Sequence, residues 1–362
     1  MNRSARSAVA AASASVLAFS LAGCGSEEHT GVISNDIVVG LLLPDRAAAR
    51  YEKFDRPVIE DKVDRLTIGE GKVVYANANQ DAALQALQVQ NMIEDEVDVL
   101  ILDAVDAKAI AGSVEKAEKA GIPVVAFDRL AEGPIDAYTS FDNEEVGHVQ
   151  GKALLKALGN KAENRRIVMV NGALTDPNAA LFKKGAHAEL DGKVTIGKEY
   201  DTEEWKPENA EANMKAAIEE LGPHAIDGVY SANDGMAGGV IAALKAAGVT
   251  KLPPVTGQDA ELAAVQRIVA GEQHMSVYKP YAPEAAAAAE MAVALAKGES
   301  LHTVAQTHVD SPTTKDIPSV LVPVIALTQA NIEETVIRDG IFTAEEICTP
   351  TYAAACAKLA IG

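Results

Sequence analysis

The sequence predicts an α/β protein of two lobes, each a parallel sheet flanked by helices. Short β-branched and apolar runs alternate along the chain with alanine-rich amphipathic stretches. The apolar runs are nearly continuous, which is typical of parallel strands covered on both faces. Without an N-terminal leader, about 330 residues remain, more than one hydrophobic core usually holds. Two domains are therefore expected.

The apolar runs define the expected strands, and the stretches between them the expected helices. One expected helix covers residues 82–94, with Leu84, Leu87, Met92 and Ile93 near one face. The expected strands are 36–43, 72–76, 97–102, 122–127, 137–141, 166–171, 194–200, 228–232, 255–257, 275–278 and 320–327.

No Gly/Ser-rich linker separates the lobes, so several short crossings are expected in place of one flexible string. The first is expected where a short strand runs into a helix, at Phe141-Asp142-Asn143. We assign residues 36–141 and about 279–305 to the N-terminal lobe. Residues 142–278 and about 306–362 are assigned to the C-terminal lobe.

Residues 1–23 are typical of an export signal. Arg3 and Arg6 precede a small-residue and apolar stretch that is too short for a confident transmembrane span. Leu21-Ala22-Gly23 leads into Cys24, the pattern of a bacterial lipoprotein signal. We expect a lipid on Cys24, the alternative being an unpaired thiol, and a polar tether over residues 24–35. The protein would then be extracytoplasmic and held at the membrane by its lipid.

The two other cysteines, Cys348 and Cys356, form an even pair in an exported chain, which favours a disulfide. On one helix they would lie roughly 12 Å apart, too far to bond. Cys348 must therefore precede the helix suggested by residues 351–359. Cysteine and histidine do not cluster at ligand spacing, so no metal is expected.

The formal net charge is −20, and removal of residues 1–23 makes it more negative because only arginines are lost. Such an acidic chain would repel the phosphates of a nucleic acid. Nucleic-acid partners are therefore not expected.

Polar side chains follow several expected strands at the point where each strand ends. Asp128-Arg129 follow residues 122–127, Asn233 follows 228–232, and Asp259 and Lys279 follow later strands. Each alone could be a solvated turn, but α/β sheets bind ligands just beyond their strand ends. Together they predict a pocket of carboxylates, amides and cations, suited to a neutral polyhydroxylated solute.

Asp234 and Trp205 are expected to have different roles near this pocket. Asp234 is expected to cap the helix that begins at Gly235. The sole tryptophan, Trp205, lies among charged residues before Pro207, in an expected loop. A lone tryptophan is usually a core residue, but this setting favours a platform on which the apolar face of a pyranose packs.

Eight sequence blocks give the chain a family resemblance from about residue 36 to 327. It resembles the periplasmic D-xylose-binding proteins and the related multi-sugar-binding proteins of the ribose/galactose type. The blocks are AARY (48–51), VAFDRL (125–130), SFDNEEVG (140–147), DPNA (176–179), WKPENA (205–210), NDGMAGG (233–239), GQDAEL (257–262) and VYKP (277–280).

The resemblance implies a two-lobed type I periplasmic binding protein fold and a set of sugar-binding residues. Arg50 would contact sugar hydroxyls, and Tyr51 would stack on the sugar where the family usually has tryptophan. Trp205 would stack on the opposite face, whereas Asp142 and Asn143 would belong to a crossing. The residues expected to hydrogen-bond the sugar are Asp128, Arg129, Asp176, Asn178, Asn233, Asp259 and Lys279.

The resemblance also implies a function: a monomeric lipoprotein that closes by hinge bending on one monosaccharide and delivers it to an ABC permease, without a cofactor. D-xylose is the first expected sugar, with glucose, galactose and arabinose as alternatives, and presentation of the sugar to a membrane receptor is a compatible role.

A glycosidase using Asp128, Asp176 and Asp259 is disfavoured because the expected binding residues are rich in amides and cations. A sugar-responsive regulator would need a DNA-binding motif where the leader lies. Residues 331–362 have no expected role beyond packing.

Overall fold

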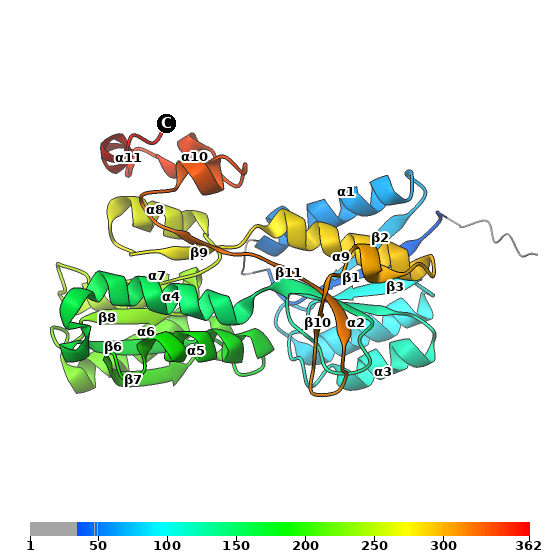
Figure 1. The fold of residues 1–362 in the computed structure, drawn as a ribbon, viewed down its shortest axis with the longest axis horizontal. Helices are drawn as coiled ribbons and strands as arrows, with labels where there is room; N and C mark the ends of the chain where they lie inside the picture. The colour runs from blue at the N-terminus through cyan, green and yellow to red at the C-terminus, as the bar shows by residue number, and fades with distance from the viewer. Residues whose placement is uncertain (1–34, 47, 49) are drawn as a thin grey trace, which may run out of the picture. The chain divides into compact units, whose positions relative to one another are not determined.

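The computed structural model describes residues 35–46, 48 and 50–362, which form two lobes of sheet and helix (Figure 1). The expected export signal, the expected lipid acceptor Cys24 and nearly all of the expected tether lie outside these residues. Within them, no helix combines the length and apolar character needed to cross a bilayer.

The first lobe is built on a sheet in the order β10-β11-β5-β4-β3-β1-β2. All neighbouring strands are parallel except β10, which is antiparallel to β11. The strands are β1 (Val38–Leu43), β2 (Lys72–Asn77), β3 (Val99–Leu102), β4 (Val124–Phe127), β5 (Ala137–Phe141), β10 (Thr307–Val309) and β11 (Ile317–Val322).

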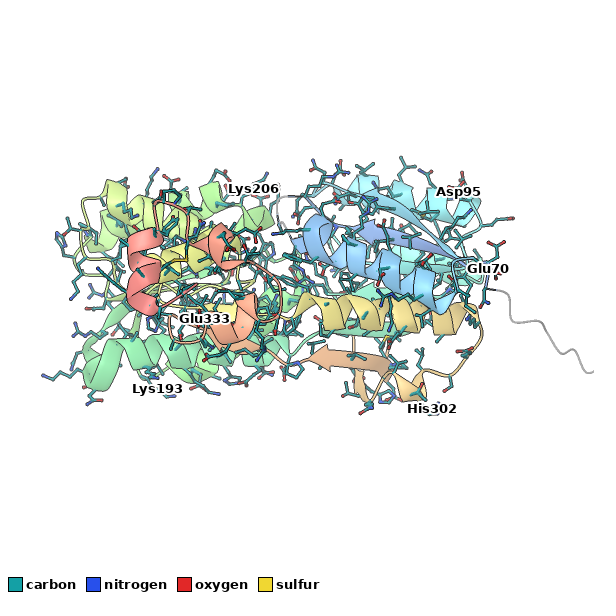
Figure 2. All side chains as sticks on the ribbon, turned by 90° about the horizontal axis from the view of Figure 1, so that it is seen from above. Glu70, Asp95, Lys193, Lys206, His302 and Glu333 are labelled. Atoms are coloured by element: carbon teal, nitrogen blue, oxygen red, sulfur yellow. A yellow bond between two sulfur atoms is a disulfide. The ribbon has the colours of Figure 1, made fainter. Side chains whose placement is uncertain are left out.

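Helices cover both faces of this sheet because successive strand residues point to opposite sides. Leu41 and Leu43 pack with α1 and α9, whereas Leu42 packs with α2 and α3. The helical segments are η1 (Tyr51–Asp55), α1 (Arg56–Leu66), α2 (Ala82–Glu94), α3 (Ala111–Lys119), α9 (Tyr281–Ala296) and η4 (Leu301–Thr303). In Figure 2, Glu70, Asp95 and His302 mark the surface of this lobe.

The second lobe contains the parallel sheet β7-β6-β8 and the antiparallel pair β9-β12. Single parallel bridges, Val229 with Val255 and Gln258 with Val277, connect the two through residues 255–258. The strands are β6 (Arg166–Asn171), β7 (Thr195–Asp201), β8 (Gly228–Ser231), β9 (Ser276–Tyr278) and β12 (Ile325–Leu327).

Helices also cover the second lobe, where α4 packs on α5 and α6 packs on α7. The short helices α10 and α11 pack on α8 near the C-terminus (Figure 1). The helical segments are α4 (Asn143–Leu158), η2 (Gly159–Asn164), α5 (Pro177–Leu190), η3 (Glu203–Trp205), α6 (Pro207–Leu221), α7 (Asp234–Ala246), α8 (Leu262–Ala270), η5 (Glu333–Ile337), α10 (Ala344–Ile347) and α11 (Ala353–Leu359).

The chain passes between the lobes through short segments. It leaves β5 of the first lobe at Phe141 and enters α4 of the second lobe at Asn143. It returns from β9 to α9 between Tyr278 and Tyr281, and crosses again from β11 to β12. Short crossings of this kind can bend as a hinge.

Two expectations about the third crossing were wrong. Residues 320–327 do not form one strand, because Pro323 interrupts the run between β11 and β12. Proline lacks the N–H that would continue the ladder. Residues 307–322 were assigned to the C-terminal lobe, but β10 and β11 extend the first sheet through pairing of β11 with β5.

The apolar face expected for α2 was right only in part, although the helix has the expected bounds. Met92 is buried and Ile93 half-buried. Leu84 and Leu87 are exposed, and Gln85 is buried in their place. The Gln85 amide donates to the Asp103 carbonyl at 2.7 Å and accepts from the Val105 N–H at 2.8 Å. These two hydrogen bonds compensate the amide for the water it loses.

The C-terminal residues are joined by a disulfide between Cys348 and Cys356, whose Cα atoms lie 5.9 Å apart. Cys348 directly follows α10 and Cys356 lies within α11, so Cys348 precedes the helix that holds Cys356, as the spacing argument required. Cys356 belongs to a cluster with residues of α8, including Val265 and Ile268. The segment is therefore anchored on the second lobe.

Candidate functional site

Residues from both lobes line one cavity, and every residue expected to bind a ligand is among them. The cavity volume, taken as the space that the centre of a water-sized sphere can occupy, is about 60 Å³. One water needs roughly 10–15 Å³ on this measure, so the cavity is several times larger. The cavity therefore suits a small solute. Its lining residues are Asp45, Ala48, Arg50, Tyr51, Asp128, Arg129, Asp176, Asn178, Phe182, Trp205, Asn233, Gln258, Asp259 and Lys279.

Arg50 is buried in the first lobe among three carboxylates. Its Nε donates to Asp55 Oδ2 at 2.8 Å and its Nη2 donates to Glu284 Oε2 at 2.5 Å. Its Nη1 lies 3.4 Å from Oδ2 of Asp128, the carboxylate that lines the cavity. The Tyr281 ring lies 4.5 Å from the guanidinium carbon. These contacts hold the guanidinium in place against the cavity wall.

Asp128 follows the last residue of β4 in a left-handed backbone conformation, with φ of 55°. Its carbonyl accepts hydrogen bonds from the Tyr138 hydroxyl at 3.0 Å, Ser140 Oγ at 2.7 Å and Asn178 Nδ2 at 3.0 Å. A left-handed conformation is unfavourable for most residues and mildest for Asp and Asn. The three hydrogen bonds stabilise it, and the turn brings the carboxylate to the cavity.

Arg129 and Asp176 connect the lobes. Arg129 Nε lies 3.0 Å from Asp176 Oδ2, and Arg129 Nη1 donates to the Ala104 carbonyl at 3.0 Å. Asp176 is the N-cap of α5, because its Oδ1 accepts from the Asn178 N–H at 2.8 Å. Its Oδ2 also accepts from Trp205 Nε1 at 3.2 Å. One carboxylate therefore orients a helix, an arginine and an indole.

The aromatic side chains enter the cavity from opposite lobes. Tyr51, on η1, has its hydroxyl 3.4 Å from Asp128 Oδ2. Trp205 packs edge-on against Phe182, with ring centroids 6.2 Å apart. A Cβ atom at Gly172 would lie 2.0 Å from Cη2 of Trp205, so glycine is needed there for the indole to fit.

Lys279 is almost fully buried, with 3% of its surface exposed. Its Nζ lies 3.0 Å from Oδ1 of Asp259 and between 5.2 and 5.4 Å from the centroids of the Phe141 and Phe182 rings. Lys279 lies in the crossing that follows β9. It thus presents a paired ammonium to the cavity.

Asn233 caps α7, and the expectation that Asp234 does so was wrong. Asn233 Oδ1 accepts from the Met236 N–H at 2.9 Å. Asp234 is instead fully buried and accepts from Ser276 Oγ and Gln273 Nε2, both at 2.7 Å. The capping bond fixes the Asn233 side chain, which faces the cavity.

The charged groups differ in how burial and neighbours shift their pKa values. Burial acts to raise the pKa of Asp128, but the nearby cations, led by Arg50, outweigh it and the pKa is lowered. Burial raises the pKa of Asp176 despite Arg129, and raises that of Glu284 strongly despite Arg50. Of these three carboxylates, Asp128 is therefore the one best held in its charged, hydrogen-bond-accepting form.

The sequence matches the model of a periplasmic binding protein domain over residues 39–300, well over half of the chain. The chain belongs to the periplasmic binding protein family. Membership of this family implies an extracytoplasmic location.

Curated relatives of this periplasmic binding protein agree over nearly their whole length. It is 37% identical over 320 residues to the D-xylose-binding periplasmic protein of Haemophilus influenzae, covering 87% of this chain and 93% of the relative. It is 36% identical over 322 residues to the protein of the same name from Escherichia coli, with the same coverage.

Solved structures share its type I fold. One is an ABC transporter solute-binding protein from Clostridium phytofermentans with bound β-D-glucose. That structure is 27% identical, with a TM-score of 0.78, covering 86% of this chain and 99% of the other.

Several cavity residues of this periplasmic binding protein were not predicted from its sequence. Asp45 follows β1 and Gln258 directly precedes Asp259, so both stand at strand ends, and the strand-end pattern could have found them. Phe182 lies inside α5 and carries no such signal. Asp55 and Glu284 were also missed; they contact Arg50 from behind the cavity, which only the tertiary structure reveals.

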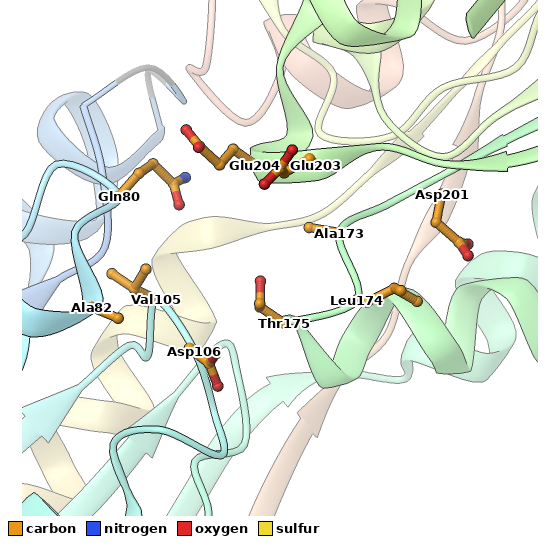
Figure 3. Close-up of a pocket in the computed structure, with 10 residues that line it drawn as sticks. All are labelled: Gln80, Ala82, Val105, Asp106, Ala173, Leu174, Thr175, Asp201, Glu203 and Glu204. Atoms are coloured by element: carbon orange, nitrogen blue, oxygen red, sulfur yellow. The ribbon is translucent and has the colours of Figure 1, made fainter.

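A second cavity has a volume of about 410 Å³, and Figure 3 shows the residues that line it. Gln80, Val105 and Asp106 line it from the first lobe, and residues 173–175 and 203–204 from the second. It contains none of the expected sugar-binding residues. In the described part of the chain, no group of three potential metal-ligating side chains comes together.

Proposed function

We propose that this protein binds one monosaccharide, D-xylose or a related aldopyranose, and delivers it to an ABC permease. The observation that carries the proposal is the cavity, where cations, carboxylates, amides and three aromatic rings surround a space for a small solute. Relatives named for D-xylose binding and a solved structure with bound glucose support the substrate class.

The ten expected residues would each make one kind of contact with the sugar, by hydrogen bonding or by packing. Asp128, Asp176 and Asp259 would accept hydrogen bonds from hydroxyls, and Arg50, Arg129 and Lys279 would donate to hydroxyl oxygens. Asn178 and Asn233 can do both. Tyr51 and Trp205 would pack on the apolar faces of the ring.

Selectivity follows from burial of these groups. When the lobes close, water leaves the cavity, and the sugar hydroxyls must replace its hydrogen bonds. An epimer with one misplaced hydroxyl leaves a buried group unpaired, at about 1–3 kcal/mol. That is roughly five- to a hundredfold in affinity.

Delivery would depend on bending of the crossings between the lobes. The lobes close on the sugar, and a permease binds the closed form, with ATP hydrolysed by a separate subunit. We propose that the protein acts as a monomer, held at the membrane by a lipid on Cys24. Replacement of Cys24→Ala should release the protein from the membrane fraction; unchanged fractionation would contradict the anchor.

Titration of the chain lacking residues 1–23 with a panel of monosaccharides tests the sugar. Calorimetry should give heat with one aldopyranose, D-xylose first and glucose, galactose and arabinose as alternatives. Emission of Trp205, the sole tryptophan, should change on the same titration. Absence of binding to every sugar would refute the function, and heat without an emission change would refute only the role of Trp205.

Three of the four cavity carboxylates have a cationic partner, which favours recognition over hydrolysis. Asp128 lies near Arg50, Asp176 near Arg129, and Asp259 near Lys279. We propose that the protein is not an enzyme; turnover of an aryl glycoside by the purified protein would contradict this. A sensory role, with the bound sugar presented to a membrane receptor, uses the same site.

A further inference from the structure

Gln258 differs from the other polar residues of the cavity because its side chain has a buried hydrogen-bond acceptor without a partner. It is 2% exposed, and its Oε1 is buried without a hydrogen-bond partner. An unpaired buried carbonyl costs free energy that a ligand hydroxyl would recover. The side chain lines the cavity, so a solute bound there lies beside this amide.

The backbone of Gln258 is held from both sides, so the amide does not depend on a flexible loop. Its carbonyl accepts from the Asp234 N–H at 3.0 Å, and the residue forms a parallel bridge with Val277 of β9. Asp259 follows with φ of 92° and binds Lys279. Gln258 is therefore fixed next to an ion pair that faces the same cavity.

Several other groups of the cavity already have protein partners. Arg129 pairs with Asp176, Lys279 pairs with Asp259, and Asn233 Oδ1 caps α7. A neutral carbonyl with no protein partner requires a hydroxyl donor at one place.

We infer that Gln258 is a specificity-determining residue that accepts a hydrogen bond from one hydroxyl of the bound monosaccharide. The inference rests on the proposed sugar-binding function and deepens it. Sugars that lack this hydroxyl leave Oε1 unpaired and bind about 5- to 100-fold more weakly. Asp128 and the arginines supply affinity, whereas Gln258 discriminates at a single position of the ring.

The test is a cycle between the protein and the ligand. The sugar that binds best to the wild type and its monodeoxy analogues, each lacking one hydroxyl, are titrated by calorimetry into wild type and Gln258→Leu. Leucine is similar in size and has no acceptor. For one analogue, the loss of affinity should be at least fivefold in wild type and twofold or less in Gln258→Leu, while the other analogues keep their losses.

Gln150→Leu is the matched control. Gln150 is a buried amide of the second lobe whose Oε1 also has no partner, and its Nε2 donates to the Ser231 carbonyl at 2.9 Å. It lies outside the cavity lining, so its variant should keep the wild-type losses for every analogue. Thermal unfolding shows which variants fold, and Gln258→Met, which is unbranched, replaces leucine if that variant does not.

The possible outcomes separate the two proposals. If Gln258→Leu weakens all sugars by one factor, or changes none, the specificity role is wrong while sugar binding stands. If wild type binds no sugar, the proposed function fails and the inference fails with it. Loss of discrimination in Gln150→Leu as well would assign the effect to general loosening of the second lobe and overturn the inference.

Discussion

Arg129 Nε lies 3.0 Å from Oδ2 of Asp176, although the arginine follows β4 of one lobe and the aspartate caps α5 of the other. Both side chains are less than a tenth exposed. Because the pair spans the lobes, its energy depends on how they are arranged. Because Arg129 and Asp176 also line the cavity, closure of the lobes brings together two of the residues expected to bind the sugar.

The variant Arg129→Met should bind sugar at least thirtyfold more weakly, because removing one partner of a buried charge pair leaves the other charge unpaired, at about 2–5 kcal/mol. Calorimetry with the best sugar measures the change. Arg165→Met is the control, since Arg165 pairs with Asp227 at 2.8 Å on the exposed surface, where ion pairs contribute little. Equal affinity in the two variants would contradict the role of the pair.

Replacement of Gly172→Ala should displace Trp205, because the added Cβ would overlap the indole. We expect weaker sugar binding and a smaller change in tryptophan emission on titration. Gly112→Ala is the matched control, since a Cβ there has no neighbour within 4 Å. Normal binding and emission in Gly172→Ala would show that the indole position does not matter to the ligand.

Asp55 should make stability depend on pH. Burial raises its pKa to about 6 although Arg50 lies beside it. The folded pKa is above the unfolded value, so the stability from this proton is present at low pH and is lost as pH rises from about 4 through about 6.

In Asp55→Asn the side chain stays neutral, and its amide oxygen can still accept from Arg50. The melting temperature of the variant relative to wild type, measured without sugar, should therefore rise between pH 4 and pH 7. Asp61→Asn, at an exposed ion pair with Arg65, should show no such trend. The same difference at both pH values for Asp55→Asn would contradict the raised pKa.

The C-terminal segment should contribute to affinity through its contact with the first lobe. The Phe342 ring lies 6.3 Å from the Phe54 ring on η1, the segment that also carries Tyr51. Phe342→Leu removes this aromatic pair and should weaken sugar binding about two- to tenfold. Leu359→Ala, in the same cluster of the second lobe, is the control. An unchanged dissociation constant in Phe342→Leu would limit residues 331–362 to packing.

Elements with strong local patterns were predicted closely. The expected strands 137–141 and 166–171 have the bounds of β5 and β6, and the expected helix 82–94 has those of α2. Periodicity and residue preference act within a few residues, so they can be read along the chain. The isolated bridge at Val255 and the short strand β10 were not predicted as such, because pairing with distant strands defines them.

The buried face of α2 shows what local sequence patterns cannot predict. Its leucines suggested one buried face, but Gln85 is buried because Asp103 and Val105 offer hydrogen-bond partners from the next strand end. Likewise Asn233, and not the adjacent Asp234, caps α7. Ser276 and Gln273, more than 35 residues away, use the Asp234 carboxylate instead.

The sequence by itself determined the two-lobed α/β class and the polar residues at the strand ends, among them Asp128, Asn233 and Asp259. Alternation, strand ends and helix starts depend on neighbours along the chain. Only the tertiary structure decided that Arg129 pairs with Asp176 and that Gln258 keeps an unpaired acceptor. Hydrogen bonds and burial depend on distances of a few ångströms between segments far apart in sequence, and those distances exist only once the chain has folded.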